Sequence, residues 1–295
     1  IKYNIWLFII RIKQHHVLKR GAEHMDHRPI GVFDSGLGGL TAVRELMQLL
    51  PREDIIYFGD TARVPYGVRS PETILKFARQ DMNFLCSYDL KAVVIACGTV
   101  STTSLSTLRR EYHLPIIGVV EPTAAQAARV TRSGRIGLIA TAASIRSGAY
   151  EKRIAARRPG ATVYGKACPL FVPLVENGRF QMGDPVIETI AREYLQSMQE
   201  ADVDTLILGC THYPLLSDVI RHIMGPDVTL INSGREAARA LQALLVSSDR
   251  LNESQSNGDT SYFVSDTVDG FEEMAGLFLR SNLKGMVQQI NIEKY

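Results

Sequence analysis

Long apolar runs, a strong net charge and closely spaced cysteine pairs are all absent from this sequence of 295 residues. No run reaches the roughly 18 apolar residues of a membrane-spanning helix, so the sequence predicts no membrane contact. The formal net charge of +2 creates no strong field, which argues against nucleic acid or acidic lipid as a partner. Apolar residues make up 45% and charged residues 22% of the chain, a balance typical of globular proteins.

Cysteine is scarce as well. The four cysteines are Cys86, Cys97, Cys168 and Cys210, and they form neither a CxxC pair nor a spacing of zinc ligands. A chain of this size does not need a disulfide scaffold. The sequence therefore predicts free thiols, no metal, and a cytoplasmic location, where thiols stay reduced.

Residues 1–28 differ from the rest and are expected to be an extension that is either not native or disordered. The segment begins with isoleucine, and its apolar core at 5–10 is too short to span a membrane. Its basic residues mostly follow that core, whereas those of a signal peptide precede it. We expect translation to start at Met25, with a genuine regulatory extension as the alternative.

From residue 28 on, short apolar runs alternate with longer amphipathic segments. Most runs are continuous, a pattern typical of parallel strands covered by helices on both faces. The predicted strands are 30–34, 54–58, 92–96, 116–120, 135–140, 161–166, 205–208, 229–231 and 261–264. Helices are expected between them, for example at 71–87 and 184–198, each with proline in its first turn. The polar stretch 247–260 reads as a surface loop, and the alternation predicts an α/β fold.

Two of these runs end in the same way. The stretch "VVIACGT" (93–99) and the stretch "LILGCTHYP" (206–214) each pass from an apolar run through a small residue to a cysteine closely followed by threonine. Ligands of open α/β sheets sit beyond the carboxyl ends of the strands. Two similar sheets facing each other would therefore place Cys97 and Cys210 on opposite walls of one cleft. Cys86 and Cys168 are expected to be small buried hydrophobic residues.

A reactive thiol needs help, because a free thiol has a pKa near 8.5 and only roughly a tenth of it is thiolate at pH 7.5. Helix N-termini and neighbouring groups that donate hydrogen bonds or carry positive charge supply that help. Both Cys97 and Cys210 are expected to lead directly into helices. His212, two residues after Cys210, is the candidate neighbour.

The stretch "GVFDSGLGGLTAVREL" (31–46) predicts a strand, a glycine-rich turn and a helix, a geometry that offers backbone amides to an anion. A dinucleotide fingerprint fits poorly, because its third glycine position is Thr41 and an acid precedes the turn. No lysine follows, as a P-loop requires. We interpret the turn as a carboxylate-binding loop, with Asp34 free to meet an ammonium group or a thiol.

Three shorter motifs add candidates. The loop "ARVPYG" (62–67) can offer backbone amides and Tyr66, and "IATAAS" (139–144) ends a strand at Thr141, with Ser144 placed to cap a helix. The stretch "PLVENG" (173–178) puts Glu176 in a loop, where it is either a surface acid or a second partner for a thiol.

Together these pieces resemble glutamate racemases, of the cofactor-independent aspartate/glutamate racemase superfamily. The similarity spans 29 to about 264, and its marks are "GVFDSGLGG", "DTARVPYG", "PLVE" and "GCTHYPLL", in the family's order. The resemblance implies two similar three-layer α/β domains with mainly parallel sheets and an active site in the cleft between them. The first domain would comprise 29–122 and 234–292, the second 123–233. It also implies a homodimer that makes D-glutamate for peptidoglycan, without a cofactor.

Matched motif by motif, the resemblance makes Cys97 and Cys210 the paired acid/base thiols. It implies that Asp34 assists Cys97, and that His212 and Glu176 assist Cys210. Substrate-contact positions are occupied by Asp34, Ser35, Pro65, Tyr66, Gly67, Gly98, Thr99, Thr141, Ser144, Thr211 and His212. Gly98 departs from the family, which usually has asparagine there. Losing one hydrogen bond to a charged ligand costs about 1.5–3 kcal/mol, so this departure bears on the choice of substrate.

The hypothesis is a two-base racemisation of glutamate. One alternative is a racemase or isomerase of the same superfamily that acts on another acidic compound, such as aspartate or a hydantoin. A second is a cysteine–histidine amidase with Cys210 as nucleophile and His212 as base, which leaves Cys97 unexplained. A third is a binding protein that clamps a small dicarboxylate without turnover.

Overall fold

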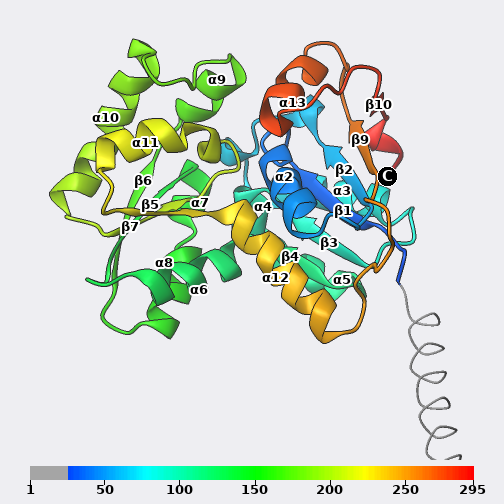
Figure 1. The fold of residues 1–295 in the computed structure, drawn as a ribbon, viewed down its shortest axis with the longest axis horizontal. Coiled ribbons are helices and arrows are strands. Elements are labelled where there is room, and N and C mark those ends of the chain that lie inside the picture. Colours follow the sequence, from blue (N-terminus) through cyan, green and yellow to red (C-terminus); the bar gives the residue numbers. More distant parts are fainter. Residues whose placement is uncertain (1–25) are drawn as a thin grey trace, which may run out of the picture.

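The computed structural model describes residues 26–295, so the expectations for residues 1–25, including a start at Met25, lie outside the described part. Two parallel sheets with flanking helices make up the fold, in two halves (Figure 1). The predicted α/β fold is confirmed. Within residues 26–295, no helix combines the length and the apolar character needed to cross a bilayer.

The first sheet has six strands in the order β10, β9, β2, β1, β3, β4, and every neighbouring pair is parallel. Its strands are β1 (Ile30–Asp34), β2 (Ile55–Gly59), β3 (Ala92–Ile95), β4 (Ile116–Gly118), β9 (Thr260–Val264) and β10 (Val287–Gln289). The helices on one face are α2 (Leu40–Leu49), α12 (Ser233–Ser247) and α13 (Phe271–Leu279), and those on the other are α3 (Pro71–Leu85), α4 (Gly98–Thr103) and α5 (Leu105–Glu111). Successive side chains of a strand point to opposite faces of the sheet. Val32 therefore packs in the core on the side of α2, α12 and α13, and Phe33 packs in the core on the side of α3, α4 and α5.

The second sheet has four parallel strands in the order β6, β5, β7, β8. Its strands are β5 (Arg135–Ala140), β6 (Thr162–Ala167), β7 (Thr205–Leu208) and β8 (Thr229–Asn232). The helices of this half are α6 (Val120–Val130), α7 (Ala142–Arg146), α8 (Ala149–Arg157), α9 (Phe171–Glu176), α10 (Pro185–Glu200) and α11 (Ser217–Met224). Residues 26–295 also form four short 3-10 helices: η1 (Thr61–Arg63), η2 (Tyr66–Val68), η3 (Tyr213–Leu216) and η4 (Ile292–Lys294).

All nine predicted strands are present, with ends that agree to within two residues. The two helices predicted at 71–87 and 184–198 are α3 and α10. Their caps explain where they begin: the Ser70 side chain accepts from the amide of Thr73, and the Asp184 side chain accepts from the amide of Val186. Strand β10 was not predicted, because it has no apolar run: only Val287 is apolar and buried, and the other two residues are polar and exposed.

The chain crosses between the halves through helices. The boundary proposed between 122 and 123 falls inside α6, and the return follows β8 into α12. Helix α12 lies between the two halves in Figure 1 and packs against both α2 and α6. One hydrophobic core therefore continues from the first half into the second. The domain boundaries themselves stay a proposal.

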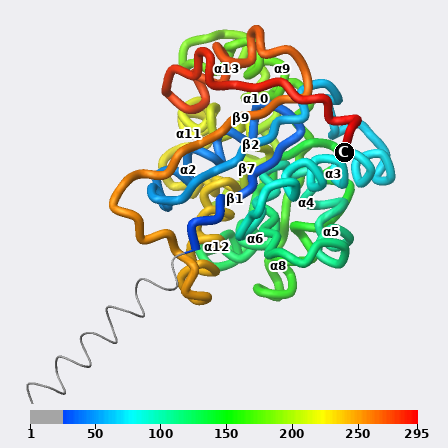
Figure 2. The backbone as a smooth tube through the Cα atoms, turned by 90° about the vertical axis from the view of Figure 1, so that its right-hand side faces the viewer, coloured from blue at the N-terminus to red at the C-terminus, as the bar shows by residue number. Residues whose placement is uncertain are grey.

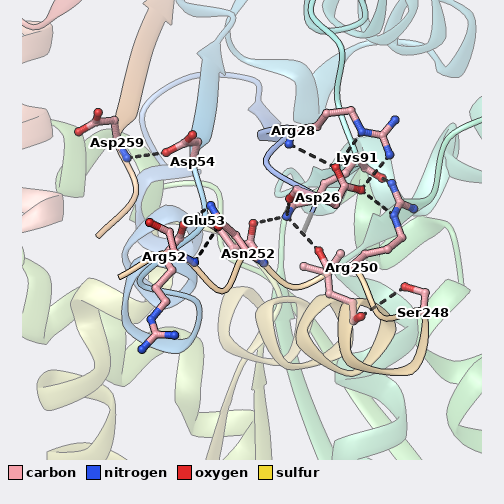
Figure 3. Close-up of polar contacts among 12 residues, drawn as sticks. Asp26, Arg28, Arg52, Glu53, Asp54, Lys91, Ser248, Arg250, Asn252 and Asp259 are labelled. Carbon is pink, nitrogen blue, oxygen red and sulfur yellow. Dashed lines mark hydrogen bonds and ion pairs between the residues drawn. The ribbon is translucent and has the colours of Figure 1, made fainter. Parts of the chain in front are cut away.

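Residues 26–28 are bound to the first half, unlike the extension expected for 1–28. Asp26 pairs with the side chains of Arg28 and Arg250, and its carbonyl accepts from the buried Lys91 ammonium at 2.7 Å (Figure 3). Lys91 also forms an ion pair with Glu53. In the expected loop 247–260, the described residues between Ser247 and Thr260 form neither helix nor strand, although this network holds part of the loop.

The C-terminal segment runs back beside α3 (Figure 2), where the carbonyl of Tyr295 accepts a hydrogen bond from the Asn83 side chain.

Candidate active site

A cavity of about 380 Å³ lies where the carboxyl ends of the two sheets meet. The first half contributes the loops after β1, β2 and β3, and the second half those after β5, β6 and β7. The residues lining it are Ser35, Gly36, Val64, Pro65, Tyr66, Gly67, Val68, Cys97, Gly98, Thr99, Thr141, Ala142, Cys168, Pro169, Val172, Pro173, Glu176, Gly209, Cys210, Thr211, His212 and Tyr213. Both cysteines that end the doubled motif therefore face one space.

Cys97 follows β3 and is the N-cap of α4. Its sulfur lies 3.6 Å from the Ser35 hydroxyl and donates to it. Burial and the nearby Asp34 carboxylate raise the pKa of Cys97 to about 12. At neutral pH this group is a protonated thiol, which makes it a proton donor in the resting site.

Cys210 has a different environment. It follows β7 but leads into a turn and the 3-10 helix η3, so the expected helix directly after it is wrong. Nδ1 of His212 lies 3.8 Å from the Cys210 sulfur, and Nε2 of His212 lies 2.8 Å from Oε1 of Glu176. Burial alone would lower the pKa of His212, but its hydrogen bonds with Cys210 and Glu176 outweigh burial and raise that pKa to about 10. His212 is therefore an imidazolium that can stabilise negative charge on the Cys210 sulfur.

The glycine-rich loop binds its own acid. Oδ2 of Asp34 accepts from the amide of Gly36 at 3.2 Å and from the amide of Gly39 at 3.0 Å. Those two amides are consequently occupied by Asp34, while Ser35 and Gly36 of the same turn line the cavity. The interpretation of this turn as a carboxylate-binding loop stays a prediction. Oδ1 of Asp34 has no hydrogen-bond partner among the described residues, and burial raises the pKa of this carboxyl above its ordinary value.

Most of the predicted substrate contacts line the cavity, but Asp34 and Ser144 are not among the described residues that do. Ser144 is fully buried, and its amide donates to the Thr141 hydroxyl at 3.3 Å. Thr141, not Ser144, is therefore the cap of α7, contrary to our expectation. Tyr66 lines the cavity, while its hydroxyl binds Asp60 and Asp81.

The structure explains why glycine stands at position 98. A Cβ atom on this residue would lie 2.6 Å from the carbonyl oxygen of Gly209, closer than such contacts allow. The loops that carry Cys97 and Cys210 therefore touch through their backbones. A hydroxyl contact of 3.1 Å between Thr99 and Thr141 joins the halves at the same place.

The sequence did not single out the apolar part of the wall, which includes Val64, Val68, Ala142, Pro169, Val172, Pro173 and Tyr213. A usable signal was present, because "CPLFVPLVE" follows β6 at the same edge of its sheet as Cys210. Cys168 belongs to this wall and is buried, as expected, whereas Cys86 is exposed at the end of α3, contrary to expectation.

Comparisons with known proteins identify the family of this chain. The sequence model of the Asp/Glu/Hydantoin racemase family matches residues 30–241. The chain belongs to this family. It is 46% identical over 269 residues to a glutamate racemase of Geobacter metallireducens, covering 91% of this chain and 98% of that relative.

Solved structures give the same relationship. The glutamate racemase of Francisella tularensis in complex with D-glutamate has a TM-score of 0.84 and 38% identity, covering 92% of this chain and all (100%) of that one. The resemblance to glutamate racemases is thus confirmed. An aspartate racemase of Picrophilus torridus shares only 14% identity at a TM-score of 0.56, which shows the fold alone.

Proposed function

We propose that this protein interconverts L-glutamate and D-glutamate without a cofactor, with Cys97 and Cys210 as paired acid/base thiols. The observation that carries the proposal is that thiols from two different sheets line one cavity. Inversion at one carbon needs a base on one face and an acid on the other. The 46% identity to a glutamate racemase over 91% of this chain supports glutamate as the substrate.

The proton steps balance within the pair of thiols. In one direction, a Cys210 thiolate removes the α-proton and forms an S–H bond, and the electron pair of the C–H bond stays on carbon. The Cys97 thiol then protonates the opposite face and becomes a thiolate. The reverse direction exchanges the two roles. The raised pKa of Cys97 and the imidazolium beside Cys210 support this starting arrangement.

The supporting groups act on one thiol each. Asp34 lies on the Cys97 side and adds negative charge there, which keeps a proton on Cys97. Glu176 holds His212, and His212 offers positive charge to Cys210. Hydroxyl groups of Ser35, Thr99, Thr141 and Thr211 are available to bind substrate and to stabilise the charge that develops at the α-carbon.

A substrate other than glutamate is the second candidate, and Gly98 is the observation behind it. The side chain usual in the family would require the backbone at Gly209 to shift, because a Cβ at position 98 would lie 2.6 Å from its carbonyl oxygen. A panel of L-glutamate, L-aspartate and hydantoins, followed by optical rotation, decides between them. Turnover of aspartate faster than glutamate would replace the proposed substrate.

The decisive experiment is incubation with L-glutamate in D₂O, followed by optical rotation and Cα deuterium. We expect D-glutamate and deuterium at Cα for the wild type, and loss of racemisation for Cys97→Ser and Cys210→Ser. Cys86→Ser is the matched control, because that thiol is exposed and outside the cavity. An amidase would survive Cys97→Ser, and a binding protein would bind glutamate with no exchange at all.

At the level of the cell, we propose that the product D-glutamate serves peptidoglycan synthesis and cell shape. A cytoplasmic location follows from the four free cysteines, which persist best in a reducing compartment. We also propose a homodimer, as the family resemblance implies. Light scattering of the purified protein tests that state, and a mass of one chain would contradict it.

A further inference from the structure

A buried polar cluster lies against the part of the cavity wall that follows β2. We call it the Arg63 cluster, and it consists of Asp60, Arg63, Tyr66 and Asp81. The side chains of Asp60 and Asp81 are fully buried, Tyr66 is 1% exposed, and the Arg63 side chain is 10% exposed. Tyr66 is one of the substrate contacts expected above and lines the cavity, whereas neither the proton transfer nor those contacts use Asp60, Arg63 or Asp81.

Hydrogen bonds and ion pairs join the four side chains of the Arg63 cluster. Nε of Arg63 lies 2.6 Å from Oδ2 of Asp60, and Nη2 of Arg63 lies 3.0 Å from Oδ1 of Asp81. The Tyr66 hydroxyl donates to Oδ2 of Asp60 and lies 3.2 Å from Oδ2 of Asp81. The guanidinium of Arg63 also lies over the Phe77 ring, 4.3 Å from its centroid.

The balance of charges and protons explains why two buried acids share one guanidinium. Burial and the neighbouring Asp60 raise the pKa of Asp81 well above its ordinary value, which favours the protonated form of this carboxyl. A phenol carries one hydroxyl proton, which Tyr66 gives to Asp60. A protonated Asp81 can then donate to the Tyr66 oxygen, which leaves Asp60 as the buried carboxylate that faces the guanidinium. The exposed Glu293 carboxylate lies farther away, 3.7 Å from Nη1 of Arg63.

The backbone beside this cluster is the cavity wall. The consecutive residues 64–68 all line the cavity. Within this stretch Tyr66 is anchored through its hydroxyl, and Arg63 is anchored directly before it. Gly67 also meets the other half, because a Cβ on it would lie 3.1 Å from the Cβ of Thr141. A small shift of this wall therefore changes both the shape of the cavity and its contact with the opposite half.

We propose that Asp60, Arg63 and Asp81 are positioning residues, which act through Tyr66 to hold the 64–68 wall in the shape that binds glutamate. This inference rests on the proposed racemase activity. Displacing a binding wall by about 1 Å can cost on the order of a hundredfold in rate, so a cluster remote from the thiols can control affinity.

The test is steady-state racemisation by purified full-length variants. We expect Asp60→Asn, Tyr66→Phe and Asp81→Leu to raise KM for glutamate by roughly tenfold, with a smaller change in kcat. Asp81→Asn should restore most of the affinity, because an amide can donate to Tyr66 and accept from Arg63 as a protonated carboxyl does. Glu111→Gln is the matched control, since it breaks an exposed pair with Arg79 of the same helix α3.

Thermal unfolding separates folding from positioning. If Asp60→Asn does not fold, Tyr66→Phe decides, because it removes one oxygen and keeps the ring. An unchanged KM in folded Tyr66→Phe, or equal effects of Asp81→Leu and Asp81→Asn, overturns the inference. Absence of racemisation in the wild type contradicts the proposed function instead. Binding of D-glutamate, measured by calorimetry on the same variants, then still decides whether the cluster shapes the cavity.

Discussion

At the scale of single residues, the two thiols of the cavity differ in charge environment. Cys97 is buried beside a carboxylate, whereas Cys210 lies beside an imidazolium that Glu176 holds. The two sulfurs of the proposed reaction therefore meet opposite charges, a carboxylate beside Cys97 and an imidazolium beside Cys210.

We predict that Glu176→Gln lowers kcat by about tenfold or more, because His212 loses the partner that keeps it charged. The basic limb of the pH–rate profile should move to lower pH, since the pKa of His212 is raised to about 10 by its hydrogen bonds, including the one with Glu176. Rate measurements between pH 6 and pH 10 check both. An unshifted basic limb would rule out this role for Glu176.

The same ion pair makes a prediction for stability. The pKa of His212 rises from 6.5 to about 10 on folding, so the folded state holds this proton more tightly than the unfolded chain. The stabilisation is fully present below pH 6.5 and is lost as the pH rises through about 10. Urea unfolding should show a gap between wild type and Glu176→Gln that shrinks from pH 6 to pH 10; a gap that grows would contradict the shift.

Gly98 gives a prediction of steric origin. Gly98→Ala places a methyl group 2.6 Å from the Gly209 carbonyl, so the two cysteine loops must move apart. We expect a loss of about 1–3 kcal/mol in stability and a fall in kcat of about tenfold or more. Gly165→Ala on β6 is the matched control, because its nearest contact would be an ordinary 3.4 Å. Wild-type activity in Gly98→Ala would show that the loops tolerate separation.

At the scale of secondary structure elements, the site is assembled from strand ends. Cys97, Thr141 and Cys210 each follow the carboxyl end of a parallel strand, and the segment after that strand decides the environment of the side chain. Asp34 is the last residue of β1, and Glu176 ends helix α9 and not a loop, contrary to expectation. After β3 the chain enters α4 at once, whereas after β7 it makes a turn that brings His212 back to Cys210. Similar strand patterns thus lead to different surroundings for the two sulfurs.

The cap of α10 makes a prediction about elements outside the site. The Asp184 carboxylate accepts from the amide of Val186 and pairs with Arg179. Asp184→Ala should lower the free energy of unfolding by about 1 kcal/mol, and Asp184→Asn by less, because asparagine also caps. Racemisation by both variants should equal that of the wild type. Reduced activity with intact stability would show that this helix end affects the cavity.

At the scale of the whole molecule, the two halves are joined at the site as well as through α6 and α12. The Thr41 hydroxyl of α2 donates to the Thr211 carbonyl at 2.7 Å, directly beside Cys210. Gly38 makes this approach possible, because a Cβ there would lie 2.1 Å from the Thr211 hydroxyl oxygen. The first half therefore holds the loop that carries the second half's thiol.

We predict that Thr41→Val lowers stability by about 1–3 kcal/mol, because it leaves a buried carbonyl without this donor. kcat should fall as the Cys210 loop loses its restraint, and deuterium exchange at Cα should fall with it. Thr189→Val is the matched control, since it removes a similar hydroxyl–carbonyl bond on the exposed side of α10. Equal activity of the two variants would show that the Thr41 bond does not restrain the loop.

Local patterns in the sequence determined the strand set, the two cysteine-bearing strand ends and the family. The continuous apolar runs predict buried parallel strands without any knowledge of neighbours, and the glycine-rich and "GCTHYP" motifs are contiguous. The short strand β10 could not be predicted from the sequence, because it depends on its pairing with β9 and not on an apolar composition of its own.

Only the tertiary structure decided what each of these residues meets. Asp34 turned out to bind the amides of its own loop, Thr141 and not Ser144 caps α7, and Gly98 turned out to face Gly209. The Arg63 cluster joins residues of β2's loop to α3, and the Thr41 bond joins two halves across 170 positions of sequence. Such contacts depend on how helices and sheets pack, and neither periodicity nor spacing records which distant backbone will approach.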